Sequence, residues 1–102
     1  MTSRLELHEE LCNLLGSRNA YFQPPESVKM TYPGVRYSIS RPNTKFANDS
    51  LYSLTNGYEI TFIDKDPDAD YITKMYATFQ NVSFDRFYIA DNLNHWSFTL
   101  FY

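Results

Sequence analysis

The sequence predicts a single α+β domain, residues 1–102, in which an antiparallel β-sheet carries two amphipathic helices packed on one face. Apolar residues recur every three or four positions at 7–15 and 71–79, the spacing of a helix with one buried side. Apolar and polar residues alternate at 35–40, which is typical of a half-buried strand, and turn residues at 91–94 divide an aromatic C-terminal segment into two strands. A chain of 102 residues suits one core, and no repeat or linker divides it.

The first helix is predicted to begin near Ser3, because Ser3 and Glu6 have the spacing of a capping box. Gly16 can supply the left-handed residue that ends it. His8 lies on the apolar side, but no second ligand stands at metal-binding spacing, so we interpret it as a boundary residue. The apolar side comprises Leu7, Leu11, Cys12, Leu14 and Leu15.

Four strands are predicted in the middle of the chain. Residues 21–23 form a short run that Pro24 and Pro25 confine to a sheet edge, since proline cannot donate to a ladder. In residues 35–40, Val35, Tyr37 and Ile39 fall on one face. The dipeptide at 56–57, Asn-Gly, is typical of a tight turn and predicts a hairpin between 51–54 and 58–63.

An acidic run between 64 and 70 resembles a calcium loop only at first sight. In either frame its sixth position is not Gly and its twelfth is not Glu, as such a loop requires. We interpret Asp66 instead as the N-cap of a helix whose first residue is Pro67, with Asp68 and Asp70 in its first turn. The apolar side of that helix comprises Tyr71, Ile72, Met75, Tyr76 and Phe79.

The C-terminal segment is predicted to be one long hairpin, with strands at 83–90 and 95–102 joined by turn residues 91–94. Aromatic residues occur on both faces of it, so one face can cover the helices while the other meets a neighbour. The chain holds nine Tyr, eight Phe and one Trp. The alternative is that these rings simply fill the protein's own core.

Composition narrows the functional classes. Twelve acidic residues against nine basic ones give a net charge of −3, which lacks the basic excess that binding to nucleic-acid phosphates needs. A lone cysteine, Cys12, suits a reducing compartment, and no apolar run has the length of a membrane span or a signal peptide. We expect a soluble intracellular protein that binds neither a membrane nor a specific nucleic-acid sequence.

The sequence indicates no enzyme. His95 with Asp91 and Arg86 could be drawn as an acid–base set, and Ser83 or Cys12 as a nucleophile. However, no hydrolase elbow, zinc motif or phosphate-binding loop accompanies them. We interpret His95 as a structural residue that satisfies turn carbonyls, and we expect no catalytic residue, cofactor or metal.

Five motifs, taken in their order and spacing, resemble a family of small tailed-bacteriophage neck proteins, known as tail terminator, tail completion or head-tail joining proteins. They are YFQPP at 21–25, YP at 32–33, IDKDPD at 63–68, SFDR at 83–86 and ADNLNH at 90–95, followed by an aromatic end, FY, at 101–102. The motifs cover most of the chain. They do not indicate which layer of the neck it occupies.

The resemblance implies a structural virion protein, a ring subunit that terminates the tail tube and joins it to the head connector. Its partners would be identical subunits in a ring, expected to be a hexamer through which genome DNA can pass, the tail-tube protein, and a connector or head-closure protein. It would assemble in the host cytoplasm and reside in the virion. One alternative is a head-closure or adaptor subunit of the connector; another is a small ligand-binding or enzymatic domain.

Residues 41–50 are the first candidate for the contact with neighbours, because this polar stretch is longer than a usual hairpin loop. We expect it to reach a neighbouring subunit or the tube, together with the aromatic end of the chain. The predicted interface residues are Arg41, Lys45, Phe46, Asp49, Phe101 and Tyr102.

Overall fold

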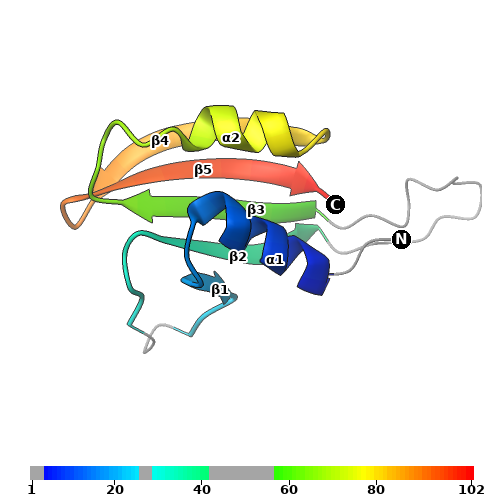
Figure 1. Ribbon diagram of the computed structural model, residues 1–102, viewed down its shortest axis with the longest axis horizontal. Helices are drawn as coiled ribbons and strands as arrows, with labels where there is room; N and C mark the ends of the chain where they lie inside the picture. The colour runs from blue at the N-terminus through cyan, green and yellow to red at the C-terminus, as the bar shows by residue number, and fades with distance from the viewer. Residues whose placement is uncertain (1–3, 26–28, 42–56) are drawn as a thin grey trace, which may run out of the picture.

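The computed structural model describes residues 4–25, 29–41 and 57–102, and it has the two helices and the sheet shown in Figure 1. In chain order the elements are α1 (Arg4–Leu15), β1 (Ala20–Phe22), β2 (Gly34–Arg41), β3 (Gly57–Asp64), α2 (Tyr71–Thr78), β4 (Val82–Ala90) and β5 (Leu93–Phe101). The strands form one five-stranded sheet in the order β1-β2-β3-β5-β4. The predicted α+β class is therefore confirmed.

The sheet is mixed, which corrects the prediction that it is antiparallel. β1 pairs with β2 in parallel, whereas the pairs β2–β3, β3–β5 and β4–β5 are antiparallel. Pro24 and Pro25 follow β1 and end its ladder, so the chain returns to the starting end of β1 before β2 begins. Alternation of apolar residues reveals a strand but not its direction, which explains the error.

β1 lies at the sheet edge, as the prolines predict, and Gln23 extends its pairing by one residue. The Gln23 backbone N–H donates to the Tyr37 carbonyl at 2.8 Å. Its side-chain oxygen then accepts from the Ile39 N–H at 3.2 Å. A side chain thus replaces the next backbone group of the ladder, at a residue whose φ is 44°.

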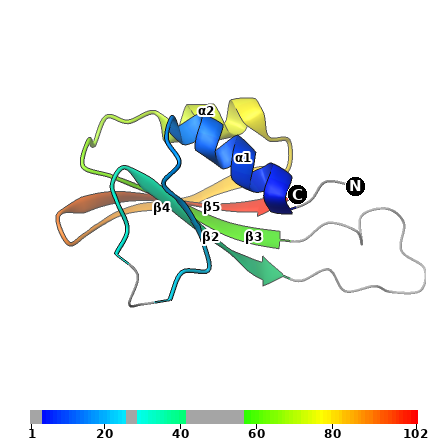
Figure 2. The same ribbon diagram turned by 60° about the horizontal axis from the view of Figure 1, so that its bottom comes forward.

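The buried core contains residues of one face of the sheet together with residues of both helices. Paired residues of neighbouring strands share a face, and the register places three apolar rows side by side. These rows are Val35–Phe62–Trp96–Phe87, Tyr37–Ile60–Phe98–Phe84 and Ile39–Tyr58–Leu100–Val82. Leu7 and Leu11 of α1 and Tyr71 and Met75 of α2 join the same buried cluster. Figure 2 shows α1 and α2 above the sheet.

The predicted end of α1 is confirmed. The helix stops at Leu15, and Gly16 has a φ of +82°, the left-handed conformation that Gly adopts without steric cost. The Gly16 N–H donates to the Cys12 carbonyl at 2.9 Å. Ser3, the predicted start, lies outside the described residues.

The predicted start of α2 is wrong, because the helix begins at Tyr71 and not at Pro67. The Asp64 carboxylate accepts the Asp66 N–H at 3.0 Å, and the Asp66 carboxylate accepts the Asp68 N–H at 2.9 Å. Each aspartate therefore bonds the backbone two residues ahead, which favours turns over helix. Asp66 does not cap α2; Asp70 is the residue at the N-cap position, and its side chain makes no capping bond.

The C-terminal hairpin is confirmed with a tighter turn than predicted. Asp91 and Asn92 alone form it, with φ of 52° and 62°, and Asn94 already belongs to β5. The Asn94 side-chain amide donates to the carbonyls of Asp64 and Lys65 at 3.2 Å each, which ties the hairpin to the end of β3. In the predicted middle hairpin, residues 51–56 lie outside the described residues, and β3 is paired with β2 and β5.

Candidate functional site

The predicted interface residues are only partly described. Lys45, Phe46 and Asp49 lie outside the described residues, and for Arg41 only the backbone, at the end of β2, is described. Phe101 ends β5 with 38% of its surface exposed. Tyr102 follows it and is half-buried.

Tyr102 fastens the end of the chain to the helices. Its ring packs edge-on against Phe79, with 5.8 Å between ring centroids. Its hydroxyl donates to the Glu10 carboxylate of α1. Burial and the neighbouring Glu10 carboxylate raise the pKa of Tyr102, because both favour the neutral hydroxyl. This part of the predicted interface therefore contributes to the fold.

The sheet has a second face, opposite the apolar rows, which we call the second face. The register assigns it the rows Arg36–Thr61–Ser97–Arg86, Ser38–Glu59–Thr99–Ser83 and Ile63–His95–Tyr88. It is richer in polar residues than the face that carries the apolar rows. Its central positions are nonetheless shielded, since Thr61 and Ser97 are each only 4% exposed.

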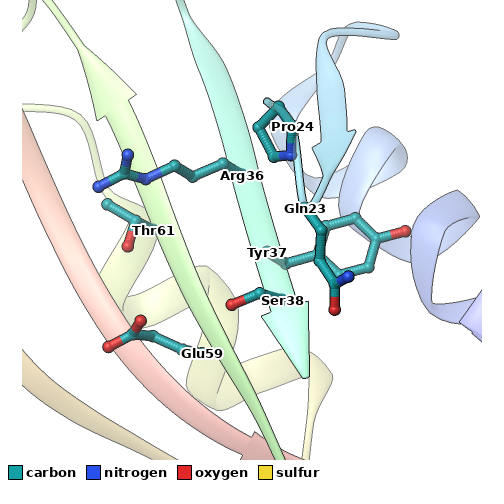
Figure 3. A pocket seen from close by; sticks show the side chains of 7 residues that line it. All are labelled: Gln23, Pro24, Arg36, Tyr37, Ser38, Glu59 and Thr61. Atoms are coloured by element: carbon teal, nitrogen blue, oxygen red, sulfur yellow. The ribbon is translucent and has the colours of Figure 1, made fainter. Parts of the chain in front are cut away.

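A shallow depression lies on the second face where β1 ends beside β2 and β3. Its volume is about 220 Å³. Figure 3 shows Arg36, Thr61 and Glu59 on one side of the strands, while the Tyr37 ring points the other way. Sites for small molecules usually enclose about 300–1,000 Å³. The depression suits a side chain or a few waters better than an enclosed substrate.

On the same second face, but over β4 and β5 at the far edge of the sheet from β1, three side chains form a stack. The Tyr88 ring lies on His95, with 4.6 Å between centroids and 17° between planes. The guanidinium carbon of Arg86 lies 4.8 Å from the centroid of Tyr88, in cation–π geometry. Such a stack covers the hairpin and leaves the charge of Arg86 at the surface.

His95 has the structural contact that the sequence predicts. Its Nδ1 lies 3.0 Å from the Leu93 carbonyl oxygen, which only accepts, so this nitrogen carries the proton. Burial lowers the pKa of His95, and Arg36 lowers it further, while the Leu93 bond and Asp91 act in the opposite direction. Arg86 reaches the imidazole only through the Tyr88 ring. His95, Asp91 and Arg86, considered above as an acid–base set, therefore do not form a group of direct side-chain contacts.

His8 and Cys12, which were also considered for chemistry, have contacts or burial that serve the fold. The His8 Nδ1 lies 2.7 Å from the Tyr37 hydroxyl, and Arg4 donates to the same hydroxyl at 3.4 Å. Cys12 is 3% exposed, and burial raises the pKa of its thiol, which disfavours the reactive thiolate. Ser83 is exposed on β4.

In the acidic run, the carboxylates of Asp64 and Asp66 accept hydrogen bonds from backbone N–H groups of the same run. Across residues 4–25, 29–41 and 57–102, no three His, Cys, Asp or Glu side chains lie together in an arrangement that could hold a metal ion. In the same ranges, neither helix has the length and apolar character needed to cross a membrane.

Sequence patterns could not reveal the stack of Arg86, Tyr88 and His95. Their proximity depends on the pairing of β4 with β5, because the turn after Ala90 sets Tyr88 opposite His95. The bulge between Phe84 and Arg86 lies beyond these residues and decides only which side chains of the earlier part of β4 share their face. Only the alternating aromatic residues of β4 hinted that both faces would be occupied.

Comparison with protein-family models, curated proteins and solved structures found no match to this chain. The resemblance to phage neck proteins therefore stays a prediction from the sequence motifs. Four of them, at 21–25, 63–68, 83–86 and 90–95, fall at strand ends, turns and the β4 bulge.

Proposed function

We propose that the protein is a structural subunit of a phage neck, which forms a ring at the end of the tail tube and joins the tail to the head connector. The observation that carries this proposal is spatial. The motifs at 32–33, 63–68 and 90–95 meet at one end of the sheet, since Gly34 pairs with Ile63 and Ile63 pairs with His95. Segments far apart in the chain thus form one continuous surface, which we call the hairpin end.

The layer arrangement supports an assembly role. In this proposal both helices cover a single face of the sheet, and the second face remains available to neighbouring subunits. Leu11 and Met75, one from each helix, are fully buried in the same cluster against the apolar rows. The second face carries surface charges, among them Arg36 and Glu59, which can fix the orientation of neighbours.

The proposed partners are identical subunits, in a ring of six, the tail-tube protein below and a connector or head-closure protein above. Genome DNA would pass through the ring without being read. The alternative role is a head-closure or adaptor subunit, which binds the connector but not the tube. A ligand-binding or enzymatic role is less well supported, because neither of two depressions encloses a ligand. The one beside Arg36 holds about 220 Å³, and the one beside Phe79 and Tyr102 holds about 410 Å³ but is open to solvent.

The test uses purified protein with tail tubes that lack a terminator and, separately, with heads that carry a connector. Electron microscopy of negatively stained samples should show a ring at one end of each tube, and tubes so capped should then join heads. Binding to heads alone would support the head-closure role. If neither tubes nor heads bind the protein, the neck proposal is wrong.

Two phenylalanine variants locate the contact. Phe101, 38% exposed, ends β5, whereas Phe87, 45% exposed, lies on β4 near the hairpin turn. Aromatic anchors dominate many interfaces, and an exposed one contributes little to folding. Phe101→Ser should abolish capping of tubes with an unchanged melting temperature. Phe87→Ser is the matched comparison, because Phe87 lies near the hairpin end and Phe101 lies at the other end of the sheet. Normal capping by Phe87→Ser would place the tube contact at the Phe101 end, whereas lost capping would place it at the hairpin end.

A further inference from the structure

β4 is an edge strand with an unusual distribution of side chains. It lies at the end of the strand order, and its outer side has no neighbouring strand among the described residues. Phe87 and Ile89 are 45% and 67% exposed, although both belong to the apolar side of the strand. Asp85 and Arg86, also exposed, sit beside each other at the bulge. Apolar exposure on a free edge indicates a pairing surface.

The hydrogen-bond pattern identifies the residues that face outward. In an antiparallel pair, residues that bond the partner strand alternate with residues that point away from it. The Phe101 N–H donates to the Asn81 carbonyl at 3.0 Å, so Asn81 faces β5 and the next residue along β4 faces outward. At the other end, the two-residue turn after Ala90 makes Ala90 face β5 and the residue before it face outward. The backbone groups that point outward therefore belong to Val82, Phe84, Phe87 and Ile89.

We propose that β4 is the edge through which two copies of this protein pair, antiparallel and about a two-fold axis between Asp85 and Arg86. The two sheets then form one continuous sheet of ten strands. The strand that pairs with β4 is the β4 of a second copy, because this edge is complementary to itself in three ways. Its charges, its apolar side chains and its outward-pointing backbone groups each match those of a second copy.

Charge complementarity follows directly from this axis. Asp85 of one copy lies opposite Arg86 of the other, and the symmetry repeats the contact, so two opposite-charge pairs form at the centre. The Asp85 carboxylate accepts from the Thr99 hydroxyl at 2.7 Å, which holds it on the second face. Arg86 lies on that face too, over Tyr88. The two charges thus meet on the same side of the joined sheet.

The same axis matches the apolar residues. It sets Phe84 opposite Phe87 and Val82 opposite Ile89, and all four are outward-bonding residues on the helix side of the sheet. In a regular strand this register would set residues of opposite faces against each other. The bulge removes the conflict, because the extra residue between Phe84 and Arg86 shifts the face. Both strands carry the same bulge, so their halves stay in register.

One outward group is already occupied in the single chain. The Phe84 N–H donates to the Tyr76 hydroxyl of α2 at 2.9 Å. Tyr76 is 51% exposed, so its side chain can swing away when the strand of a second copy supplies a carbonyl instead. The Tyr76 hydroxyl therefore protects the edge of the separate chain, and Tyr76→Phe should strengthen pairing.

This pairing is independent of the proposed neck function. A two-fold interface is closed by two copies, whereas a ring of six requires a head-to-tail interface on other surfaces. Failure of tube capping therefore says nothing about β4, and a failure to form dimers says nothing about capping.

The experiment measures the dissociation constant of the purified chain by sedimentation velocity over a range of concentrations. The wild type should show a monomer–dimer equilibrium. Asp85→Arg should weaken it about tenfold or more, because two attractions become two repulsions. Adding Arg86→Asp to that variant should restore dimers, since each new arginine again faces an aspartate. Asp68→Arg makes the same charge change on an exposed turn away from β4 and should not alter the equilibrium.

A second measurement tests the register. Ser83 and Tyr88 should lie opposite each other across the axis, so Ser83→Cys combined with Tyr88→Cys should give covalent dimers on oxidation, while either change alone should not. Circular dichroism checks that each variant folds. A strictly monomeric wild type, an Asp85→Arg variant with unaltered dimers, or a charge swap that fails to restore them would each overturn the proposal.

Discussion

The Tyr71 hydroxyl donates a 2.7 Å hydrogen bond to Oδ2 of Asp64, and this bond joins the first residue of α2 to the last residue of β3. The Tyr71 ring stacks on Phe62, with 4.6 Å between centroids, and meets Trp96 edge-on at 5.1 Å. Oδ1 of Asp64 meanwhile accepts the Asp66 N–H. The acidic run therefore positions α2 mainly through Asp64, and not through a helix cap at Asp66.

The first prediction concerns the stability that this bond provides. Tyr71→Phe should lower the free energy of unfolding by about 1–2 kcal/mol, because it removes a hydrogen bond to a charged acceptor while keeping the ring. Asp66→Ala should cost less than about 1 kcal/mol, since it removes one bond in an exposed turn. Urea unfolding followed by the fluorescence of Trp96, the only tryptophan, measures both changes.

Asp64→Asn is the companion variant, because an amide keeps the shape of the side chain but can accept only one of the two hydrogen bonds that the carboxylate accepts from Asp66 and Tyr71. It should lower the free energy of unfolding at least as much as Tyr71→Phe does. The outcome that would contradict this prediction is an Asp66→Ala variant that loses more free energy of unfolding than Tyr71→Phe. Asp66 would then support α2 itself, beyond its hydrogen bond in the turn.

Helices and strands were predictable where a periodic pattern was long. α1, β2 and the final hairpin follow from the spacing of Leu7 and Leu11, of Val35 and Tyr37, and from the turn residues after Ala90. The start of α2 was not predictable, because an Asp followed by a Pro is compatible both with the N-cap of a helix and with a turn. The start of the helix is decided by Tyr71, whose hydroxyl is held by Asp64 and whose ring packs against Trp96, a residue distant in the sequence.

The candidate surfaces were less predictable than the elements. The sequence indicates that β4 is aromatic on both faces, but the face of each side chain depends on the bulge between Phe84 and Arg86. The parallel direction of β1 likewise depends on how the chain returns after Pro25. Both features arise from strand pairing, which a single-chain pattern does not encode.

The second prediction concerns alkaline pH. The pKa values of Tyr37, Tyr71 and Tyr102 are raised above the usual 10.0, first of all by burial. The folded chain therefore keeps protons that the unfolded chain releases once the pH exceeds 10.0. The stability that these groups contribute is fully present below pH 10 and is lost as the pH rises toward their folded pKa values.

Urea midpoints at about pH 8 and about pH 10.5 measure the effect, since unfolded tyrosines titrate near pH 10. The wild type should lose stability between the two values, and the variant Tyr71→Phe, Tyr102→Phe should lose less of its own. Tyr32→Phe is the matched control, at a tyrosine with 37% exposure outside the core. An equal loss in the double variant and the wild type would assign the alkaline effect to other groups.

The third prediction concerns Gly34 and Gly16, where two different physical reasons favour glycine. A Cβ at Gly34 would lie 2.7 Å from the Thr31 carbonyl oxygen and 3.3 Å from that of Asn19, so the backbone atoms at the start of β2 leave no room for a side chain. Gly34→Ala should cost about 1–3 kcal/mol, as overpacking does, and Gly34→Asn should cost at least as much.

Gly16 provides the contrast, because a Cβ there meets nothing within 4 Å and only its φ of +82° favours glycine. Asparagine tolerates that conformation better than alanine does, so Gly16→Asn should be less costly than Gly16→Ala. Size thus decides the cost at Gly34 and backbone conformation decides it at Gly16. Thermal melts of the four variants test this order, and an asparagine that is better tolerated than alanine at Gly34 would contradict the close approach of Thr31.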